Sequence, residues 1–421
     1  MYKLYCRIYQ NAFRAGATML PWRRPTRLGG YNALAALLQD RGSDSVLIVT
    51  DKGLTNLNLH HDLLQALSSG GISAHIYDGT AQNPTVDNIE EALDLYKDKN
   101  CTALIALGGG SPMDCAKGVG AMMACPKKSI ADMRGQLKIL LSPNIPGLNK
   151  PANAPAGMPA TPWTFMAKMP LFIAIPTTAG SGSEVTVAAV IRDGHVKYAI
   201  NDPALIPHYV LHDPRLTVNL PPSLTATTGM DALCHAVEAY IGKSNTCRTE
   251  IDAIKAVRLI FNNLYTVYQD GHNIKARANM QKAAYLAGAA FTRAYVGNIH
   301  AISHAISGQY GTAHGLANAV IMPHVLDIYG QAVDKPLSEL AIAAGLADQF
   351  IPKREAARRF VSAIRDMNSK MGIPETISDL QSDDIPVLTK HALQEANPLY
   401  PVPVIFDYED MVRVYRRLLT D

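Results

Sequence analysis

The pattern of apolar residues changes near residue 213, and this change restricts the fold more than any other feature of the sequence. From about Gly29 to Asp213, short apolar runs alternate with amphipathic stretches, as in SVLIVTD (45–51), TALIALGGG (102–110) and LFIAIP (171–176). Such runs, separated by helix-length segments, are typical of strands buried on both faces of a mostly parallel sheet. We therefore expect an α/β unit that helices cover.

The second half of the chain has only helical periodicity. After DPRLTVNLPPS (213–223), Pro222 and Ser223 stand where a helix would start, and no strand candidate follows them. A chain of 421 residues is long enough for two or three domains. The sequence thus predicts an α/β domain over residues 1–216 and an all-helical domain over residues 217–421.

A stretch rich in Pro, Ala, Gly and Asn interrupts the first domain at about residues 143–166. This composition cannot continue a helix or a central strand. We expect a surface loop, either a bulge or a lid, and the bulge is the preferred interpretation.

Composition excludes several classes of function. The chain is 48% hydrophobic and 18% charged, with a formal net charge of +3. Such a balance predicts neither a nucleic-acid partner nor a membrane partner, and no segment reaches the ~18 consecutive apolar residues of a membrane span. Arg23, Arg24 and Arg27 stand among prolines, and we expect them in a solvated surface segment.

The six cysteines form no CxxC pair and have no regular spacing. In a chain of this size, they are typical of reduced thiols in a cytosolic protein. The N-terminal segment lacks the uninterrupted apolar core of a signal peptide. We therefore expect a cytoplasmic protein.

Two compact clusters of polar residues stand out in the second half. Asp231 and His235 are spaced i, i+4 in GMDALCHAVEAY, and His300 and His304 repeat this spacing before a glycine-containing break and His314. On a helix, the i, i+4 spacing places two side chains on one face, a turn apart. A carboxylate with imidazoles suits divalent Fe, Zn, Mn or Co. A single buried histidine is more often a hydrogen-bonded core residue, but two paired clusters favour a metal site.

The first half carries two small-residue loops that each follow a buried strand. In ALGGGSPMDCAKG, three glycines precede a helix for which Ser111 suits the N-cap, Pro112 position N1 and Asp114 position N3. Glycines and a helix N-terminus together form a cradle for phosphate, although this loop lacks the GxGxxG pattern and a plain tight turn is the alternative. The second loop is TTAGSGSE (177–184). Such loops meet at the carboxyl ends of parallel strands, where ligands bind.

Asp51 ends an earlier strand. A carboxylate there can accept a hydrogen bond from an adenosine ribose and would repel a 2′-phosphate, which favours NAD over NADP. The alternative is that Asp51 is only a turn residue.

Seven motifs, in order and over about residues 29–400, resemble the iron-dependent (group III) alcohol dehydrogenases. They are VTDKGL, YDGTAQNPT, ALGGGSPMDCAKG, AIPTTAGSGSE, TGMDALCHAVEAY, AGAAF and HAISHAISGQYGTAHGLANAVIMPHV. The resemblance implies a nucleotide-binding α/β domain followed by a helical metal-binding domain. Residues 1–22 have no counterpart that we can place, and residues 143–166 resemble an insertion.

The resemblance also implies a role for individual residues. Asp231, His235, His300 and His314 match the four metal ligands, usually of iron, with zinc as the alternative. His304 matches a histidine near the nicotinamide that is not a ligand, and Phe291 an aromatic residue of the substrate pocket. The matching contacts to NAD are Asp51, Asn83, Gly109, Gly110, Ser111, Asp114, Thr177, Thr178, Ser181 and Lys197.

We therefore expect an enzyme that interconverts a small primary alcohol and an aldehyde by hydride transfer to or from NAD. His304 is the candidate proton carrier, and the family suggests a homodimer. One alternative is an NAD- and metal-dependent lyase of the dehydroquinate synthase type, which would need Lys and Arg around the metal; segments 230–242 and 297–323 contain almost none. The other alternative is a metal-binding protein without catalytic activity, which would not need a nucleotide cradle.

Overall fold

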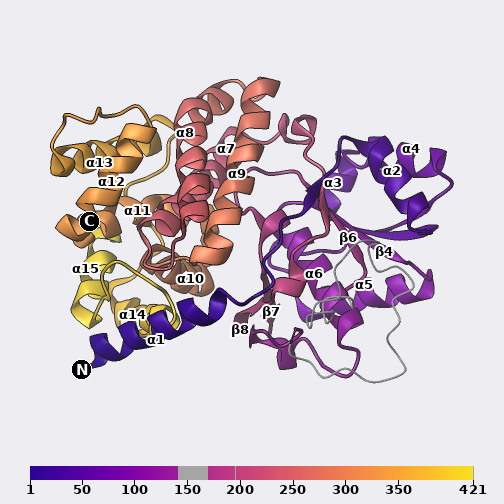
Figure 1. The fold of residues 1–421 in the computed structure, drawn as a ribbon, viewed down its shortest axis with the longest axis horizontal. Helices are drawn as coiled ribbons and strands as arrows, with labels where there is room; N and C mark the ends of the chain where they lie inside the picture. Colours follow the sequence, from indigo (N-terminus) through magenta and orange to yellow (C-terminus); the bar gives the residue numbers. More distant parts are fainter. Residues whose placement is uncertain (141–168, 195, 421) are drawn as a thin grey trace. The chain divides into compact units, whose positions relative to one another are not determined.

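The structure is a computed structural model that describes residues 1–140, 169–194 and 196–420 (Figure 1). The predicted insertion at 143–166 lies outside the described residues. Two compact units are present: residues 21–177 with 183–216, and residues 1–20 with 178–182 and 217–421. The division is thus not a single cut at residue 216, because the N-terminal segment and a five-residue loop group with the helical unit.

The α/β unit is built on a parallel sheet of six strands in the order β1-β9-β6-β4-β2-β3. The strands are β1 (Thr26–Arg27), β2 (Ser45–Val49), β3 (Ser73–Tyr77), β4 (Ala103–Gly108), β6 (Leu171–Pro176) and β9 (Tyr209–Val210). A smaller sheet contains β5 (Gly135–Gln136), β7 (Ala188–Asp193) and β8 (Val196–Asn201), and β7 pairs with β8 in antiparallel fashion.

Helices cover both faces of the six-stranded sheet, because alternate side chains of each central strand point to opposite sides. Leu47 and Val49 of β2 belong to one apolar core with residues of α5 (Val86–Asp98) and α6 (Gly110–Ala124). Val46 and Ile48 belong to another core with α2 (Tyr31–Asp40) and α4 (His61–Ser69). The short helix α3 (Lys52–Asn56) follows β2 directly. The mostly parallel, helix-covered sheet predicted from the sequence is confirmed.

The helical unit contains the remaining helices. They are α1 (Tyr2–Ala17), α7 (Pro222–Ile241), α8 (Cys247–Gln269), α9 (Ile274–Ala294), α10 (Asn298–Tyr310), α11 (His314–Tyr329), α12 (Asp334–Ala343), α13 (Lys353–Lys370), α14 (Ile385–Ala396) and α15 (Tyr408–Leu418). Helix α7 is almost completely buried from Gly229 to Ile241. The start of α7 at Pro222 agrees with the prediction. Helices α1, α12 and α14 of this unit, and α2 and α3 of the α/β unit, were not predicted.

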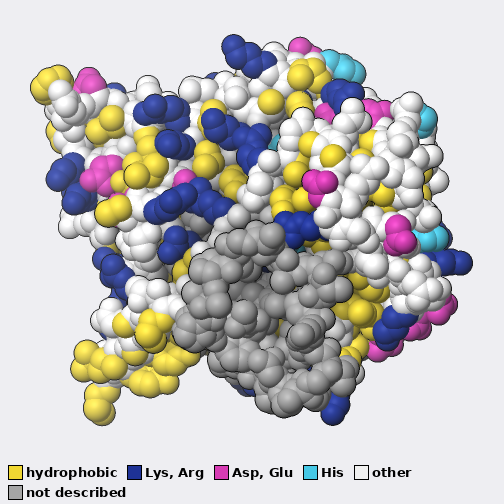
Figure 2. All heavy atoms as spheres, turned by 45° about the vertical axis from the view of Figure 1, so that its right-hand side comes forward, with side chains coloured by type: hydrophobic (Ala, Val, Ile, Leu, Met, Phe, Trp, Pro, Cys, Tyr) yellow, Lys and Arg dark blue, Asp and Glu magenta, His cyan; other side chains and the backbone are white. Residues whose placement is uncertain are grey.

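The N-terminal helix α1 lies along the C-terminal part of the chain (Figure 1). Arg7 donates to the backbone oxygens of Val402 and Pro403, and Gln10 donates to that of Tyr400. The opposite side of α1 exposes five apolar side chains, those of Met1, Tyr2, Leu4, Tyr5 and Ile8. Figure 2 shows hydrophobic side chains gathered at its lower left. Hydrogen bonds from one face therefore fix the helix on the unit.

Arg23 corrects one expectation from the sequence. Its guanidinium donates to the backbone oxygens of Pro207, at 2.9 Å, and Ile206. Burial lowers the pKa of Arg23 to about 10. The expectation of a solvated surface position is therefore wrong for Arg23. Its hydrogen bonds join the segment before β1 to the segment before β9.

In the part of the chain that the structure describes, no helix is both long enough and apolar enough to cross a lipid bilayer.

Acid should weaken the contact between β6 and the chain before β9, where His208 Nδ1 accepts a hydrogen bond from the backbone N–H of Phe172 at 3.1 Å. Burial, with the nearby charges of Arg23 and Arg41, lowers the pKa of His208 to about 3. In the unfolded chain this pKa is about 6.5. Between the two values only the unfolded chain binds the proton, so the free energy of unfolding falls as pH falls below 6.5. From pH 6.5 to 5.0, the loss is roughly 1.5 kcal/mol.

The variant His208→Asn provides the comparison, since an amide oxygen can accept from Phe172 but does not titrate. Urea unfolding at the two pH values should show a smaller loss of stability in the variant than in the unchanged protein. All other titrating groups are shared by the two proteins. Equal losses would contradict the assignment to His208.

Candidate active site

Helix α7 places a carboxylate and an imidazole on one buried face. Asp231 and His235 are 5% and 4% exposed, and Nδ1 of His235 lies 3.9 Å from Oδ2 of Asp231. This is the geometry expected of an i, i+4 pair on a helix. Nδ1 of His235 is buried and has no hydrogen-bond partner among the described residues. An orphaned lone pair of this kind fits a nitrogen that binds a metal ion.

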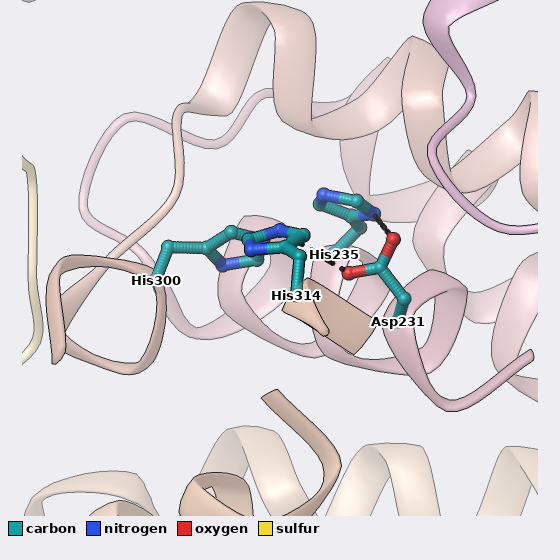
Figure 3. Close-up of side chains that lie close together, drawn as sticks. All are labelled: Asp231, His235, His300 and His314. Carbon is teal, nitrogen blue, oxygen red and sulfur yellow. Dashed lines mark ion pairs between the residues drawn. The ribbon is translucent and has the colours of Figure 1, made fainter. Parts of the chain in front are cut away.

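Two further imidazoles come from α10 and α11. His300 lies in the first turn of α10, and His314 is the first residue of α11, after a break closed by Gly311 in the left-handed conformation (φ 72°). The donor atoms of Asp231, His235, His300 and His314 all lie within 4.8 Å of one another. Figure 3 shows the four side chains converging from three helices. The structure thus brings together the four residues predicted as metal ligands.

The amide of Asn318, one turn after His314, lies among three of these donors. Its Nδ2 donates to Oδ1 of Asp231 at 2.8 Å and lies 3.2 Å from Nε2 of His300 and 3.1 Å from Nε2 of His314. The two N–H groups of this amide thus face a carboxylate oxygen and two imidazole nitrogens, all of which can offer lone pairs. The donor set therefore converges on one electropositive group, and its chemistry fits a divalent cation such as iron or zinc.

Glu238 orients the ring of His300 through a contact with its Nδ1 atom. Oε2 of Glu238 lies 2.6 Å from Nδ1 of His300, and the carboxylate also accepts from the backbone N–H groups of Gly297 and Ile299 at 2.8 Å each. A hydrogen bond at Nδ1 leaves Nε2 as the lone-pair nitrogen, which is how metal-bound histidines are usually oriented. Burial raises the pKa of Glu238 to about 8, although the backbone donors oppose this shift.

Both buried imidazoles are held neutral. Burial lowers the pKa of His235, against the opposing effect of Asp231. Burial lowers the pKa of His300 further, and the neighbouring histidines add to the shift. Neutral imidazoles are the form that binds metals.

A second group of potential ligands, Cys234, Glu238 and His300, lies beside the first. Two of its members already have partners, because the carboxylate of Glu238 accepts from two backbone N–H groups and lies against Nδ1 of His300. Burial raises the pKa of the Cys234 thiol well above its usual value, so it stays protonated. The first group is therefore the better metal site.

Phe291 of α9 stacks on His235, with ring centroids 4.1 Å apart and an interplanar angle of 14°. The ring therefore adds an apolar wall to the cluster. Its predicted role in a substrate pocket stays a prediction.

His304 does not join the four-residue group but lies against it. Its ring stacks on that of His314 at 5.0 Å. Its Nδ1 lies 2.6 Å from Oε1 of Glu395, and the hydroxyl of Tyr400 donates to the same oxygen at 2.7 Å. The contact with Glu395, whose position Tyr400 supports, gives His304 a fixed orientation.

The predicted phosphate loop lies at the start of α6. The helix begins at Gly110 with Gly109 as the N-cap, and no side chain caps it. Ser111 was expected to be the cap, and this is wrong: its hydroxyl donates to the backbone oxygen of Gln82. At Gly108 (φ 158°), a β-carbon would lie 2.4 Å from Cγ of Pro112. The uncapped N–H groups of this turn fit a phosphate group.

The other predicted contacts to NAD have varied surroundings. Asp114 accepts from the hydroxyl of Ser183 and from the backbone N–H of Val190, so both of its oxygens hold protein groups. Lys197 donates to Oδ1 of Asn83 at 3.0 Å. Their predicted contacts with NAD stay predictions.

Asp51 is the N-cap of α3, and its Oδ1 accepts from the backbone N–H of Leu54 at 3.0 Å. The turn role that we considered as an alternative is therefore present. Its Oδ2 makes no hydrogen bond to the residues that the structure describes, and the predicted contact with ribose stays a prediction.

The loop after β6 is divided between the two units. Thr177 belongs to the α/β unit and donates from its backbone N–H to the oxygen of Gly108. Thr178 and Ser181 belong to the helical unit. A β-carbon at Gly180 would lie 2.7 Å from Cβ of Thr228, and one at Gly182 would lie 2.7 Å from Cα of Gly288. Only glycine permits this loop to approach α7 and α9 so closely.

Sequence reasoning missed several residues around these sites. Glu238 is three residues after His235 on α7, and Asn318 is four after His314 on α11, so helical spacing could have indicated both. Glu395 is 91 residues from His304 and gave no local signal. Lys117 is fully buried in α6, and its ammonium donates to Ser183, Thr186 and Ala188.

Comparison with known proteins finds a matching family model for each half of the chain. A model described as iron-containing alcohol dehydrogenase matches residues 27–214. A model described as Fe-containing alcohol dehydrogenase family, C-terminal, matches residues 225–419.

Individual relatives agree with this match. The chain is 33% identical over 395 residues to alcohol dehydrogenase 4 of Saccharomyces cerevisiae (strain YJM789), covering 92% of this chain and 94% of the yeast protein. It is 33% identical over 371 residues to the NAD-dependent methanol dehydrogenase of Bacillus methanolicus, covering 87% and 90%. The crystal structure of a 1,3-propanediol oxidoreductase superposes with a TM-score of 0.84 at 31% identity, covering 95% of this chain and 100% of that one.

A methyl group added at Gly315 should disturb the cluster. A β-carbon there would lie 2.5 Å from the backbone oxygen of Thr227 on α7. Gly315→Ala should therefore push the start of α11, with His314, away from Asp231, at a cost of about 1–3 kcal/mol. Metal content and thermal unfolding should both fall.

Gly308→Ala is the matched control. Gly308 also lies in a helix, but nothing lies within 4 Å of a β-carbon there. This variant should keep its metal and its stability. Equal metal content in the two variants would show that the approach of α11 to α7 does not position His314.

Proposed function

The chain belongs to the iron-containing alcohol dehydrogenase family, and on this premise we propose that it interconverts a primary alcohol and an aldehyde with NAD at the four-residue centre. The observation that carries the proposal is the convergence of Asp231, His235, His300 and His314 within 4.8 Å, from helices α7, α10 and α11. When bound, iron supplies a Lewis acid that lowers the pKa of an alcohol, and NAD supplies the hydride acceptor.

The protein's own residues hold and shape this centre. Asp231 contributes the single negative charge of the set, and Glu238 keeps Nε2 of His300 directed at the centre. Phe291 covers His235 with an aromatic face. This apolar wall favours a small alcohol with little polar surface. The choice between iron and zinc depends on more than these N and O donors.

The NAD site in this proposal begins at the uncapped start of α6. Backbone N–H groups of Gly110 and Ser111 would bind the pyrophosphate, together with the favourable end of the helix dipole. Asn83, Lys197, Thr177, Thr178 and Ser181 would hold the rest of the dinucleotide, and Asp51 the adenosine ribose.

We assign the proton transfer to His304. A hydrogen bond from Nδ1 to Glu395 leaves Nε2 as the basic nitrogen, so Nε2 would accept the proton that the alcohol releases. Tyr400 donates to the same carboxylate oxygen and keeps Glu395 in place. Glu395 is therefore a positioning residue in this proposal.

The surroundings of the centre argue against the lyase alternative. Segments 230–242 and 297–323, which carry Asp231 and the three histidines, contain neither Lys nor Arg. A site for an acidic phosphate substrate would need such cations close to the metal.

We infer further that the protein works as a homodimer in the cytoplasm. The family resemblance suggests the dimer, and the cysteines Cys6, Cys101, Cys115, Cys125, Cys234 and Cys247 are free thiols, as expected in a reducing compartment. Light scattering of the purified protein tests the dimer.

Removing one imidazole tests the proposed centre. His300→Ala and His314→Ala, purified without air, should lose bound metal and NAD-dependent alcohol oxidation together, because a three-donor site binds metal far more weakly. Elemental analysis and an NADH absorbance assay across small alcohols and diols measure the two quantities. His391→Ala, on the exposed side of α14, is the control and should keep both. Oxidation that survives in metal-free variants would overturn the mechanism.

Neutralising Glu395 tests the proton path. Glu395→Gln should lower kcat on the order of tenfold to hundredfold, because an amide no longer fixes the proton on Nδ1 of His304. Metal content should be unchanged. Glu339→Gln is a matched control, since Glu339 also accepts a hydrogen bond from a tyrosine, Tyr240, at 2.8 Å. If both variants retain full kcat, Glu395 does not position His304.

A further inference from the structure

A cavity of about 410 Å³ lies within the helical unit, between α1 and the loop that follows α7. Its polar lining comes from Arg7, Gln10, Asn11 and Arg14 of α1, with Lys243 and Ser244 of the loop. Three of these side chains are cations, and no carboxylate is among the lining residues. Most of the lining belongs to the N-terminal segment for which the family resemblance offered no counterpart.

The positive charges of this cavity have no carboxylate partner among the described residues. Arg14 makes one hydrogen bond, to the backbone oxygen of Lys243 at 3.1 Å. The ammonium of Lys243 makes none to the described residues. No acidic residue precedes Asp40 in the sequence, so α1 itself cannot supply a counter-charge. Like charges that line one cavity repel one another, and a bound anion would offset this repulsion.

Hydrogen bonds already orient the guanidinium group of Arg7, which favours binding of such an anion. Its Nη1 donates to the side chain of Gln10 at 2.9 Å and to the backbone oxygen of Val402 at 2.6 Å, and its Nη2 donates to that of Pro403 at 2.7 Å. These bonds fix the guanidinium plane but use only three of its five N–H groups. Its remaining N–H groups, those of Arg14 and the ammonium of Lys243 are available for oxygens of a ligand.

A structural role explains only part of this arrangement. Arg7 donates to the backbone oxygens of Val402 and Pro403. One N–H of Arg14 donates to the backbone oxygen of Lys243, just after the end of α7. Lys243 and most of the Arg14 guanidinium have no such function. A ligand with several negatively charged oxygens would use both.

We propose that this cavity binds a phosphorylated small molecule. Arginine pairs with phosphate oxygens through two parallel hydrogen bonds, and a lysine adds a point charge. The volume lies in the range of about 300–1,000 Å³ that small-molecule sites occupy, so it accommodates more than a bare phosphate ion. The cavity is lined by other residues than the phosphate loop of α6, which belongs to the α/β unit.

Calorimetric titration of inorganic phosphate and of pyrophosphate tests this site. The full chain is first saturated with NADH, which occupies the loop of α6, and ionic strength is held constant. We expect one saturable site for pyrophosphate, with weaker binding of phosphate. The double variant Arg14→Ala/Lys243→Ala should weaken binding on the order of tenfold or more, because it removes charged hydrogen-bond donors. Both residues are exposed at the surface, so the variant should fold.

The control is Arg354→Ala/Arg358→Ala, which removes the same charge from an exposed face of α13. It should bind pyrophosphate like the unchanged protein. Equal weakening in both double variants would mean that only net charge attracts the anion, and this would overturn the proposal. The absence of saturable binding to the unchanged, NADH-saturated protein would overturn it as well. Neither outcome depends on catalysis.

Discussion

Asp231, His235 and His300 are between 2% and 5% exposed inside an apolar helical core, and this burial is the constraint on which the rest of the structure depends. A buried charge loses several kcal/mol of hydration unless other groups compensate. The core compensates by keeping its imidazoles neutral and by giving Asp231 the amide of Asn318 and His300 the carboxylate of Glu238. Asp231 directs its negative charge toward the same point as the imidazole nitrogens, and a divalent cation would complete such a site.

Close approach of backbones makes this burial geometrically feasible. Gly315 brings α11 against the backbone of Thr227, and Gly180 and Gly182 bring the loop after β6 against α7 and α9. The same loop carries Thr178 and Ser181, which we expect to contact NAD. The short segment 178–182 therefore groups with the helices that carry the predicted metal ligands, although Thr177, the residue directly before it, belongs to the α/β unit. This arrangement links the position of the proposed cofactor contacts to the position of the metal centre.

Local patterns predicted most of the strands and helices and reduced the ligand candidates to five residues, whereas the choice of four of them came from the family resemblance. Buried runs such as Ser45–Val49 and Ala103–Gly108 form strands as predicted, because a strand buried on both faces needs an uninterrupted apolar sequence. The i, i+4 spacing of Asp231 and His235 predicted their common face for a similarly local reason. The cap of α6 was placed wrongly because Gly109 and Gly110 adopt helix-initiating conformations without any side-chain cap. Arg23 was misjudged because its acceptors, near residue 206, are far away in sequence.

Local periodicity in the sequence shows which residue types share a helix face, since the periods of helices and strands are local properties of the chain. These patterns predicted the change from an α/β to a helical architecture near residue 216. They also indicated the candidate ligands and the glycine loops. Which distant residues come together depends on the folded chain: Glu395 lies beside His304, and Arg7, Arg14 and Lys243 line one cavity. The physical reason is that hydrogen bonds and charges act through space, and partners 91 or more than 200 residues apart leave no periodic trace in the sequence.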